Sequence, residues 1–221
     1  MSGEQGATYR LGRRGYGTHA ALLDLVRPGA RLLDLGAAGG YISELARDLK
    51  GADVLAVDLD PEACEESRAR GVETIEGDVA RLLDTGELGA RGPFDQIMLA
   101  DVLEHLLDPD TALAHAAALL APGGSVIVSL PNIAYVRARL RLARGVWRYE
   151  RTGIFDRTHL RFFTRRTAHE MVAGAGLEVE REIPVGPASY AIGRRGVAIT
   201  RLRPELLASQ LVILARPSSP R

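Results

Sequence analysis

Residues 32–41 read Leu-Leu-Asp-Leu-Gly-Ala-Ala-Gly-Gly-Tyr, and this stretch decides the fold. An apolar run leads into a glycine-rich turn, and a helical pattern follows from Ile42. Glycine tolerates a positive φ and lets a ligand approach the backbone, while the first turn of a helix offers unpaired N–H groups. A second apolar run ends at Asp58, about 20 residues after the turn, which is the spacing of a ribose-binding acid. The pattern predicts a nucleoside-type cofactor at the tips of the strands.

The glycine spacing argues against a dinucleotide fold. Counted from Gly36, the Gly-x-Gly-x-x-Gly fingerprint needs glycines where this sequence has Ala38 and Tyr41. The turn instead resembles the acidic-x-Gly-x-Gly-x-Gly motif of class I S-adenosylmethionine-dependent methyltransferases. The motif positions hold Asp34, Gly36, Ala38 and Gly40, so alanine replaces the middle glycine and adds one methyl group where the cofactor would approach.

Strands and helices alternate from residue 31 to residue 130, which predicts βαβ units and a parallel sheet. The resemblance implies an α/β, Rossmann-like, doubly wound sheet of seven strands, mostly parallel, with an antiparallel last strand. We expect a single methyltransferase domain over residues 1–221, with a flexible lead at 1–8 and a substrate-binding insert or cap at 134–163. A helix is expected from residue 101 to residue 120, and the Gly/Pro/Arg-rich stretch 186–203 is expected to be a loop.

The resemblance also implies which residues bind S-adenosylmethionine. Asp34 would meet the methionine part, Asp58 the ribose hydroxyls and Asp78 the adenine amino group. Other positions of the same strand tips are expected to line the cofactor: Gly36, Ala37, Ala38, Gly40, Leu59, Val79 and Ala100.

Composition restricts the class of protein. The 221 residues are 46% hydrophobic and 25% charged, which is ordinary for a soluble globular chain. No apolar run approaches the roughly 20 residues that span a bilayer, and the N-terminus lacks the apolar core of a signal peptide. We therefore expect a cytoplasmic protein without a membrane partner. The single cysteine, Cys64, excludes an internal disulfide and the usual cysteine-based zinc sites.

The charge is unevenly distributed although the net charge is zero. Residues 1–136 carry 11 Lys/Arg against 21 Asp/Glu, whereas residues 137–203 carry 15 arginines against 6 acids. Arginine presents a rigid fork that suits carboxylate and phosphate. The basic half is therefore either a positively charged cap that selects an anionic substrate or simply a solvated face.

A first candidate acceptor site follows the fourth predicted strand. Asp101, Glu104 and His105 stand at i, i+3 and i+4, so one helical face would present all three. The stretch resembles the Glu-x-x-Glu-His of ubiquinone-type O-methyltransferases, which implies a divalent ion such as magnesium, whose preferred ligands are oxygens. We favour a plainer alternative, in which Asp101 and Glu104 form a capping-box-like pair. A third alternative makes His105 a base or a substrate contact.

A second candidate site lies in the run 155–164, Phe-Asp-Arg-Thr-His-Leu-Arg-Phe-Phe-Thr. If this run is extended, Arg157, His159 and Arg161 share one face and form an anion-binding trio with a base. A similar run occurs in some small-molecule methyltransferases of natural-product or sugar pathways. The structural alternative pairs Asp156 with an arginine and lets His159 cap the next helix. Two weaker substrate candidates are Tyr16 and Asn132; Asn132 has a turn-closing role as its alternative.

These patterns predict an S-adenosylmethionine-dependent methyltransferase that acts on a small polar or anionic molecule in a secondary-metabolite or sugar pathway, with oxygen as the favoured methyl acceptor atom. His159 and His105 are the predicted catalytic residues. Two alternatives stay open: an RNA methyltransferase or RNA-binding module that uses residues 137–203, and a non-catalytic cofactor-binding partner. A nucleic-acid partner is not expected, because the fourth strand lacks the Pro-Pro-aromatic tetrapeptide of base-amino methyltransferases. A homodimer is a further open expectation.

Overall fold

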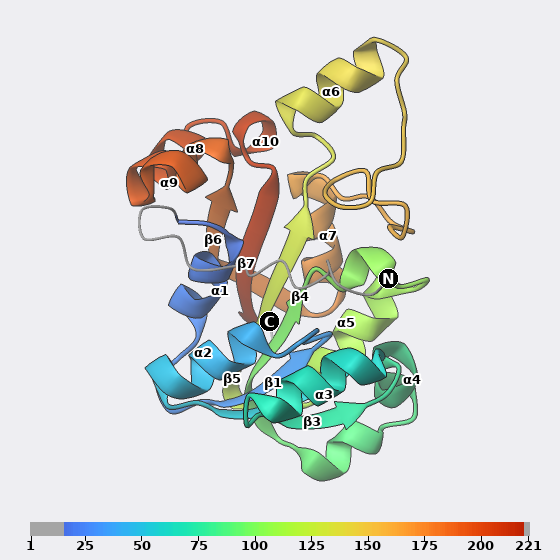
Figure 1. Cartoon of the computed structure of the whole chain (residues 1–221), viewed down its shortest axis with the longest axis vertical. Helices are drawn as coiled ribbons and strands as arrows, with labels where there is room; N and C mark the ends of the chain where they lie inside the picture. The colour runs from blue at the N-terminus through green and yellow to red at the C-terminus, as the bar shows by residue number, and fades with distance from the viewer. Residues whose placement is uncertain (1–15, 219–221) are drawn as a thin grey trace.

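The computed structural model describes residues 16–218, so the predicted lead at 1–8 lies outside the described residues. Its centre is a seven-stranded sheet of order β3-β2-β1-β4-β5-β7-β6 (Figure 1). β1 to β5 pair in parallel, and β7 runs antiparallel between β5 and β6, as predicted. The strands are β1 (Arg31–Leu35), β2 (Asp53–Asp58), β3 (Glu73–Glu76), β4 (Phe94–Ala100), β5 (Leu120–Pro131), β6 (Leu177–Val185) and β7 (Gln210–Pro217).

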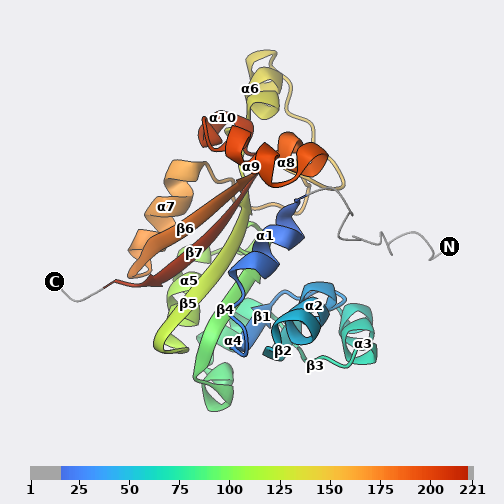
Figure 2. The ribbon, with the colours of Figure 1, turned by 90° about the vertical axis from the view of Figure 1, so that its left-hand side faces the viewer.

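Helices cover both faces of the sheet (Figure 2). One side carries α1 (Thr18–Leu25), α2 (Tyr41–Lys50) and α3 (Pro61–Ala69), and the other carries α4 (Val79–Asp84), α5 (Pro109–Ala118) and α7 (Arg165–Gly174). Because both faces are covered, the strands are almost continuously apolar, and Ile97, Met98 and Leu99 of β4 are fully buried. No helix within residues 16–218 is long and apolar enough to cross a bilayer. The cytoplasmic location stays a prediction.

The remaining helices gather at the carboxyl end of the sheet. They are α6 (Val136–Ala143), α8 (Pro187–Ile192), α9 (Arg194–Thr200) and α10 (Pro204–Leu207), and both views show them beyond the strand tips. The segment after α6 returns to the body through backbone bonds: the Glu104 carbonyl accepts from the N–H of Leu160 at 2.8 Å and of Arg161 at 3.0 Å. Its role as a cap stays a prediction.

The expectation of a loop over 186–203 is wrong, because this stretch forms α8 and α9. Pro187 opens α8 at its first position, where the missing N–H costs nothing. Gly196 lets α9 pack against α8, since a Cβ there would lie 1.9 Å from the Ala188 carbonyl oxygen. Proline and glycine, which suggest a loop, here serve helix initiation and close packing.

The expectation of a helix from residue 101 is also wrong. Asp101 has φ +57°, the 3-10 helix η2 spans only Leu103–His105, and α5 begins at Pro109. Asp108 is the true N-cap, and its Oδ1 accepts from the Thr111 N–H at 3.0 Å. The favoured capping-box pairing of Asp101 with Glu104 therefore does not form.

Candidate active site

The glycine-rich turn after β1 has a left-handed backbone at three alternate positions. Gly36, Ala38 and Gly40 have φ of +73°, +47° and +71°. A side chain at residue 40 would place a Cβ 2.3 Å from Ser67 Oγ, so only glycine fits there. Alanine accepts the left-handed conformation at a cost of roughly 1–2 kcal/mol. The replacement of the middle glycine thus preserves the shape of the turn.

Asp58, at the tip of β2, holds this turn from the neighbouring strand. Its Oδ2 accepts from the Ala38 N–H at 2.7 Å, and its Oδ1 accepts from the Asp60 N–H at 3.0 Å. Each carboxylate oxygen has a second lone pair, so the group can still accept from two ribose hydroxyls. The next side chain, Leu59, is 65% exposed and offers an apolar surface of the kind that an adenine ring would cover.

Asp34 and Asp78 also have structural roles. Asp34 is buried and accepts from Ser43 Oγ at 2.6 Å, which ties β1 to α2; burial raises its pKa to about 6. Asp78 is exposed and caps α4 by accepting from the Arg81 N–H at 3.0 Å.

The predicted cofactor residues thus gather at the carboxyl ends of β1 to β4, where the strand order reverses between β1 and β4 and where open α/β sheets bind ligands. Val79, at the start of α4, packs in the core, and Ala100 ends β4. Their contacts with a cofactor stay predictions.

A pocket of about 290 Å³ lies next to the end of β4, where Asp101 lines it. The ends of β4, β5 and β7, the 3-10 helix η2, the segment 152–159 and α8 all contribute to it. Its lining residues are Asp101, Glu104, His105, Pro131, Thr152, Gly153, Ile154, Asp156, His159, Tyr190, Ser209 and Gln210. Five of these twelve residues carry a carboxyl or an imidazole group.

Asp101 is held at the pocket by two strands. Ser129 Oγ of β5 donates to its carboxylate at 2.5 Å, and Gln210 Nε2 of β7 donates to the same oxygen. Gln210 also donates to Ser129 Oγ at 3.0 Å. This network fixes a non-glycine residue with a left-handed backbone, a conformation that is often retained at functional sites.

Two imidazoles share the pocket, and their hydrogen bonds fix their tautomers. His159 Nδ1 lies 3.2 Å from the Ile154 carbonyl, and His105 Nδ1 lies 3.2 Å from the Thr158 carbonyl. Because a carbonyl only accepts, Nδ1–H donates in both rings, and in the neutral form of an imidazole Nε2 then keeps the lone pair. The ring centroids are 4.9 Å apart. Burial lowers the pKa of His159, so this imidazole is neutral near pH 7 and can accept a proton.

Glu104 is the unusual group of the pocket. Its side chain is 1% exposed, and within residues 16–218 neither carboxyl oxygen has a hydrogen-bond partner. Burial, with a smaller contribution from the Asp101 charge, raises its pKa to about 9. In the protein without a bound cation, Glu104 is therefore a neutral carboxylic acid at pH 7.

This protonation makes stability depend on pH. Between the unfolded pKa of 4.5 and the folded pKa of about 9, the native state keeps a proton that the unfolded chain releases, so stability falls as pH rises. We expect Glu104→Gln to remove this dependence, with a gain over wild type that grows by up to about 1.4 kcal/mol per pH unit from pH 5 to pH 8. Denaturant unfolding of both proteins across this range measures the difference. A gain that is equal at pH 5 and pH 8 contradicts the expectation.

The extended arrangement predicted for the second site is wrong. The run 157–161 is not extended: Asp156 Oδ1 accepts from the N–H and Oγ1 of Thr158, which makes a turn. Arg161 donates to the Leu107 carbonyl at 2.6 Å, and neither Arg157 nor Arg161 lines the pocket. His159 does line it. The trio on one face does not form, because the turn at Asp156 breaks the alternation of side chains on which it depended.

The structural alternative for this run is not what the structure shows either. Thr164, not His159, caps α7, with a capping box to Thr167. Asp156 Oδ1 accepts hydrogen bonds from Thr158 rather than from an arginine.

Tyr16 and Asn132 are not placed as substrate contacts. The Tyr16 hydroxyl donates to Asp24 Oδ2 at 2.8 Å, and Arg194 stacks over its ring. Asn132 is fully buried, and its Nδ2 donates to the Ala208 carbonyl at 2.9 Å. Neither residue lines the pocket.

We expect Asn132→Ala to destabilise the fold by about 2–4 kcal/mol, because buried backbone groups lose their partners. The side chain also donates to the Glu205 carbonyl at 3.3 Å and accepts from the Ala134 N–H at 3.0 Å, so three connections are lost. Urea unfolding measures the loss. Asn132→Asp, of matched size, keeps only the bond from the Ala134 N–H and sets a carboxyl oxygen against the Ala208 and Glu205 carbonyls, so it should destabilise the fold as well. A change below about 1 kcal/mol in Asn132→Ala contradicts the structural role.

Sequence reasoning missed several lining residues. Tyr190 lies within the stretch 186–203 that was expected to be a loop, Ser209 directly precedes the last strand, and Gln210 opens that strand without a motif around it. Only the insertion of β7 beside β5 brings Gln210 to Asp101.

Comparison with known proteins agrees with this architecture. Residues 13–182 match the model of a family described as a methyltransferase domain, which is more than half of the chain. The chain belongs to this family. It is an S-adenosylmethionine-dependent methyltransferase of class I, as the glycine-rich turn predicted.

The individual relatives match either half of the chain or the whole fold at low sequence identity, so they do not identify the subfamily. A ubiquinone biosynthesis O-methyltransferase of Xanthomonas oryzae is 39% identical over 115 residues, which cover 51% of this chain and 47% of that protein. The chain thus aligns with about half the length of the curated relatives it matches. The CcbJ methyltransferase of Streptomyces caelestis shares the fold at TM-score 0.64 and 18% identity, with 93% and 90% of the two chains covered.

A solved relative holds the cofactor. The magnesium protoporphyrin IX methyltransferase of Synechocystis, determined with bound S-adenosylmethionine, matches at TM-score 0.57 and 15% identity, with 90% of this chain and 76% of that chain covered. At these identities the structural likeness establishes the fold, and the acceptor must be argued from the pocket.

Proposed function

We propose that this methyltransferase transfers a methyl group to a hydroxyl oxygen of a small polar molecule in a biosynthetic pathway. The observation that carries the proposal is the position of His159. A neutral imidazole with a free Nε2 lone pair lies in a pocket next to the end of β4, one of the strand tips where the predicted cofactor residues gather. A hydroxyl acceptor needs such a base near neutral pH, whereas an acceptor that is already ionised needs none.

When bound at the strand tips, S-adenosylmethionine supplies an electrophilic methyl group on a sulfonium sulfur. The turn 36–40 and Asp58 fit this cofactor, and Asp58 would hold its ribose. His159 Nε2 takes the proton of the acceptor hydroxyl, and Ile154 keeps the ring oriented through Nδ1. Tyr190 and Pro131 enclose the acceptor, and the segment 134–163 would act as its cap. Alignment of the acceptor is the main contribution of the protein, worth up to about 7–11 kcal/mol.

The pocket does not favour an anionic acceptor. The expected arginine cap would have offered guanidinium groups to an anion, but among residues 16–218 no arginine lines the pocket. Asp101 and Asp156 do line it, beside the neutral Glu104. Carboxylates disfavour an anion and accept from hydroxyls, so we propose a neutral acceptor that carries hydroxyl groups.

A second candidate role of the same residues is to bind a divalent ion. Glu104, His105 and His159 each offer a ligand atom, and these atoms lie within 4.8 Å of one another. The unpartnered oxygens of Glu104 fit a cation, and each histidine donates its other N–H to a carbonyl, as metal-bound histidines do. An ion here would polarise the acceptor oxygen. Asp101, expected in the set, is replaced by His159, and two imidazoles favour a transition metal over magnesium.

Calorimetric titration with Mg²⁺, Mn²⁺ and Zn²⁺ separates the two uses. If the group holds an ion, we expect Mn²⁺ or Zn²⁺ to bind wild type more tightly than Mg²⁺, and Glu104→Gln to weaken that binding at least about tenfold. If His159 acts as a base alone, activity survives a chelator and no saturable heat is seen with any of the three ions.

A two-stage experiment tests the proposed function. Calorimetry with S-adenosylmethionine and S-adenosylhomocysteine, with NAD as the control, is expected to show micromolar binding of the two sulfur nucleosides only. Methyl transfer is then measured with a panel of catechols, phenols and sugars against carboxylates and phosphonates. If only the carboxylates and phosphonates are methylated, the proposal of a neutral acceptor is wrong. Cofactor binding without any turnover favours a non-catalytic partner.

A further inference from the structure

Two exposed segments at the carboxyl end of the sheet are basic and contain no acidic residue. The arm, residues 137–149, comprises most of α6 and the turn after it, and the hairpin, residues 190–203, comprises the end of α8 and all of α9. Their arginines are Arg137, Arg139, Arg141, Arg144 and Arg148 in the arm and Arg194, Arg195, Arg201 and Arg203 in the hairpin. Within residues 16–218, Arg141 pairs with Glu150 and Arg194 with Asp24, while the other seven form no ion pair.

Large apolar side chains stand among these arginines. Each is between 41% and 78% exposed: Leu140, Leu142, Trp147 and Tyr149 in the arm, and Tyr190, Ile192, Ile199 and Leu202 in the hairpin. They make up eight of the twelve large hydrophobic side chains that are exposed in the described residues. Exposed apolar side chains that cluster at one end of a molecule indicate an interaction surface, whereas single ones scattered over a surface are common.

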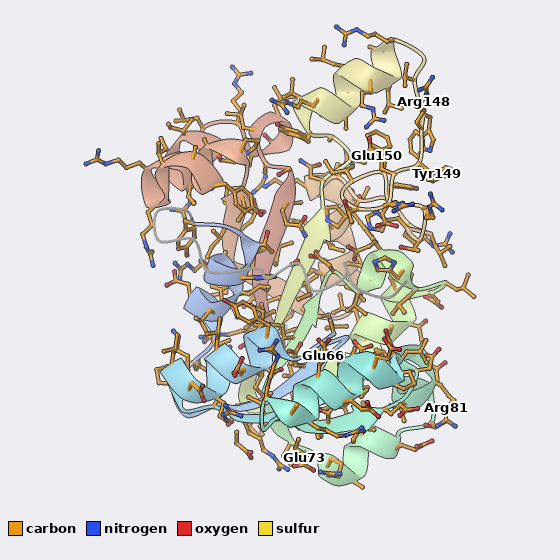
Figure 3. All side chains as sticks on the ribbon, in the orientation of Figure 1. Glu66, Glu73, Arg81, Arg148, Tyr149 and Glu150 are labelled. Atoms are coloured by element: carbon orange, nitrogen blue, oxygen red, sulfur yellow. The ribbon has the colours of Figure 1, made fainter. Side chains whose placement is uncertain are left out.

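Both segments flank the acceptor pocket. Tyr190 of the hairpin lines the pocket, and the residues that follow the arm, Thr152 to Ile154, line it from the other side. Figure 1 shows α6 and the α8–α9 pair at the same end of the molecule, and Figure 2 shows them there after a quarter turn. Figure 3 shows Arg148 and Tyr149 beside α6 at this end, and Arg81 and Glu73 towards the opposite end.

The composition of the two segments selects one kind of partner. Guanidinium groups pair with phosphate, and tryptophan and tyrosine suit the boundary between headgroups and acyl chains. The aliphatic side chains Leu142, Ile199 and Leu202 favour a lipid over RNA, because RNA binding uses stacked aromatic rings and leaves aliphatic chains in water. A second copy that met the same surface about a twofold axis would bring arginine against arginine.

We propose that the arm and the hairpin dock together on the surface of an anionic lipid bilayer, with the acceptor pocket facing the lipid. The expectation of no membrane partner depended on the absence of a spanning run, and surface docking needs none. The inference extends the proposed function, since the acceptor would then be taken from the bilayer. The docking itself does not depend on methyl transfer and is tested separately.

Vesicle flotation tests the proposal with the full chain. The protein is mixed with vesicles of phosphatidylcholine alone or with about 30 mol % phosphatidylglycerol, a typical anionic surface. We expect flotation with the anionic vesicles, little with the neutral ones, and partial release in about 0.5 M salt, where charges are screened beyond roughly 4 Å. No flotation with either vesicle, or equal flotation with both, overturns the proposal.

Variants test each component of the surface. We expect R148E/R201E, with one substitution in each segment, and L142S/L202S each to lower the partition coefficient at least about tenfold. The matched controls are R68E/R81E, two exposed arginines on α3 and α4, and L49S on α2, and we expect them to float like wild type. Calorimetry should show unchanged S-adenosylmethionine binding in every variant, which separates docking from the proposed function. Flotation of both surface variants at the wild-type level overturns the proposal.

Two further outcomes identify another occupant. If wild type does not float and elutes as a dimer that R148E/R201E converts to a monomer, the surface binds a second copy. If wild type binds polyuridylate with a steep salt dependence but does not float, the partner is RNA. Either result overturns lipid docking.

Discussion

Glutamine in place of His159 is expected to lower kcat by about 10²–10⁴-fold, the usual contribution of a general base. The imidazole is the group in the pocket whose lone pair and lowered pKa both suit proton acceptance near pH 7. Glutamine keeps the approximate size and polarity, so the fold and S-adenosylmethionine binding should persist. Methyl transfer to the best acceptor of the panel, with calorimetry of the cofactor, measures both quantities.

Two other histidine variants serve as comparisons for His159→Gln. His115→Gln changes an exposed histidine that pairs with Asp84 away from the pocket, and it should leave kcat unchanged. His105→Gln tests whether the second imidazole is equivalent. The pH profile decides the role of His159: a base gives a rate that falls below its pKa in wild type, and this limb disappears in His159→Gln. A kcat within about threefold of wild type would remove His159 from the mechanism.

The second large effect is expected at Asp58. Alanine there removes both ribose acceptors and leaves the Ala38 N–H without its partner, so the Kd of S-adenosylmethionine should rise at least about tenfold. The acceptor KM, measured at saturating cofactor, should change little, because Asp58 does not line the acceptor pocket. Calorimetry measures the cofactor affinity directly.

Asp60→Ala is the control, because it removes the same negative charge from a nearby position. Asp60 lies two residues away and caps α3 by accepting from the Glu62 N–H at 3.0 Å, so its loss removes the same charge but not the ribose contact. Asp58→Asn separates the hydrogen bonds from the charge, since the amide keeps one acceptor. If Asp60→Ala weakens cofactor binding as much as Asp58→Ala does, the ribose assignment is wrong.

Sequence reasoning succeeded where one short stretch carries the whole signal. The turn 36–40 follows an apolar strand and precedes a helix, and each of these features can be read from neighbouring residues. The capping box of α7, between Thr164 and Thr167, is local in the same way. The prediction for 186–203 failed because glycine and the single proline, Pro187, have different roles in a loop and in a pair of packed helices. The close approach of Gly196 to Ala188, which favours the packed helices, is a tertiary contact.

The sequence by itself determined the alternation of strands and helices over residues 31–130, the glycine turn and the acids at the strand tips, because side-chain period and turn chemistry act over a few residues. The tertiary structure alone decided the content of the acceptor pocket. Two backbone bonds to the Glu104 carbonyl bring His159 against His105, and the pairing of β7 with β5 brings Gln210 to Asp101. The turn at Asp156 leaves Arg157 outside the pocket. Which distant segments meet depends on long-range backbone bonds, and no local pattern encodes these.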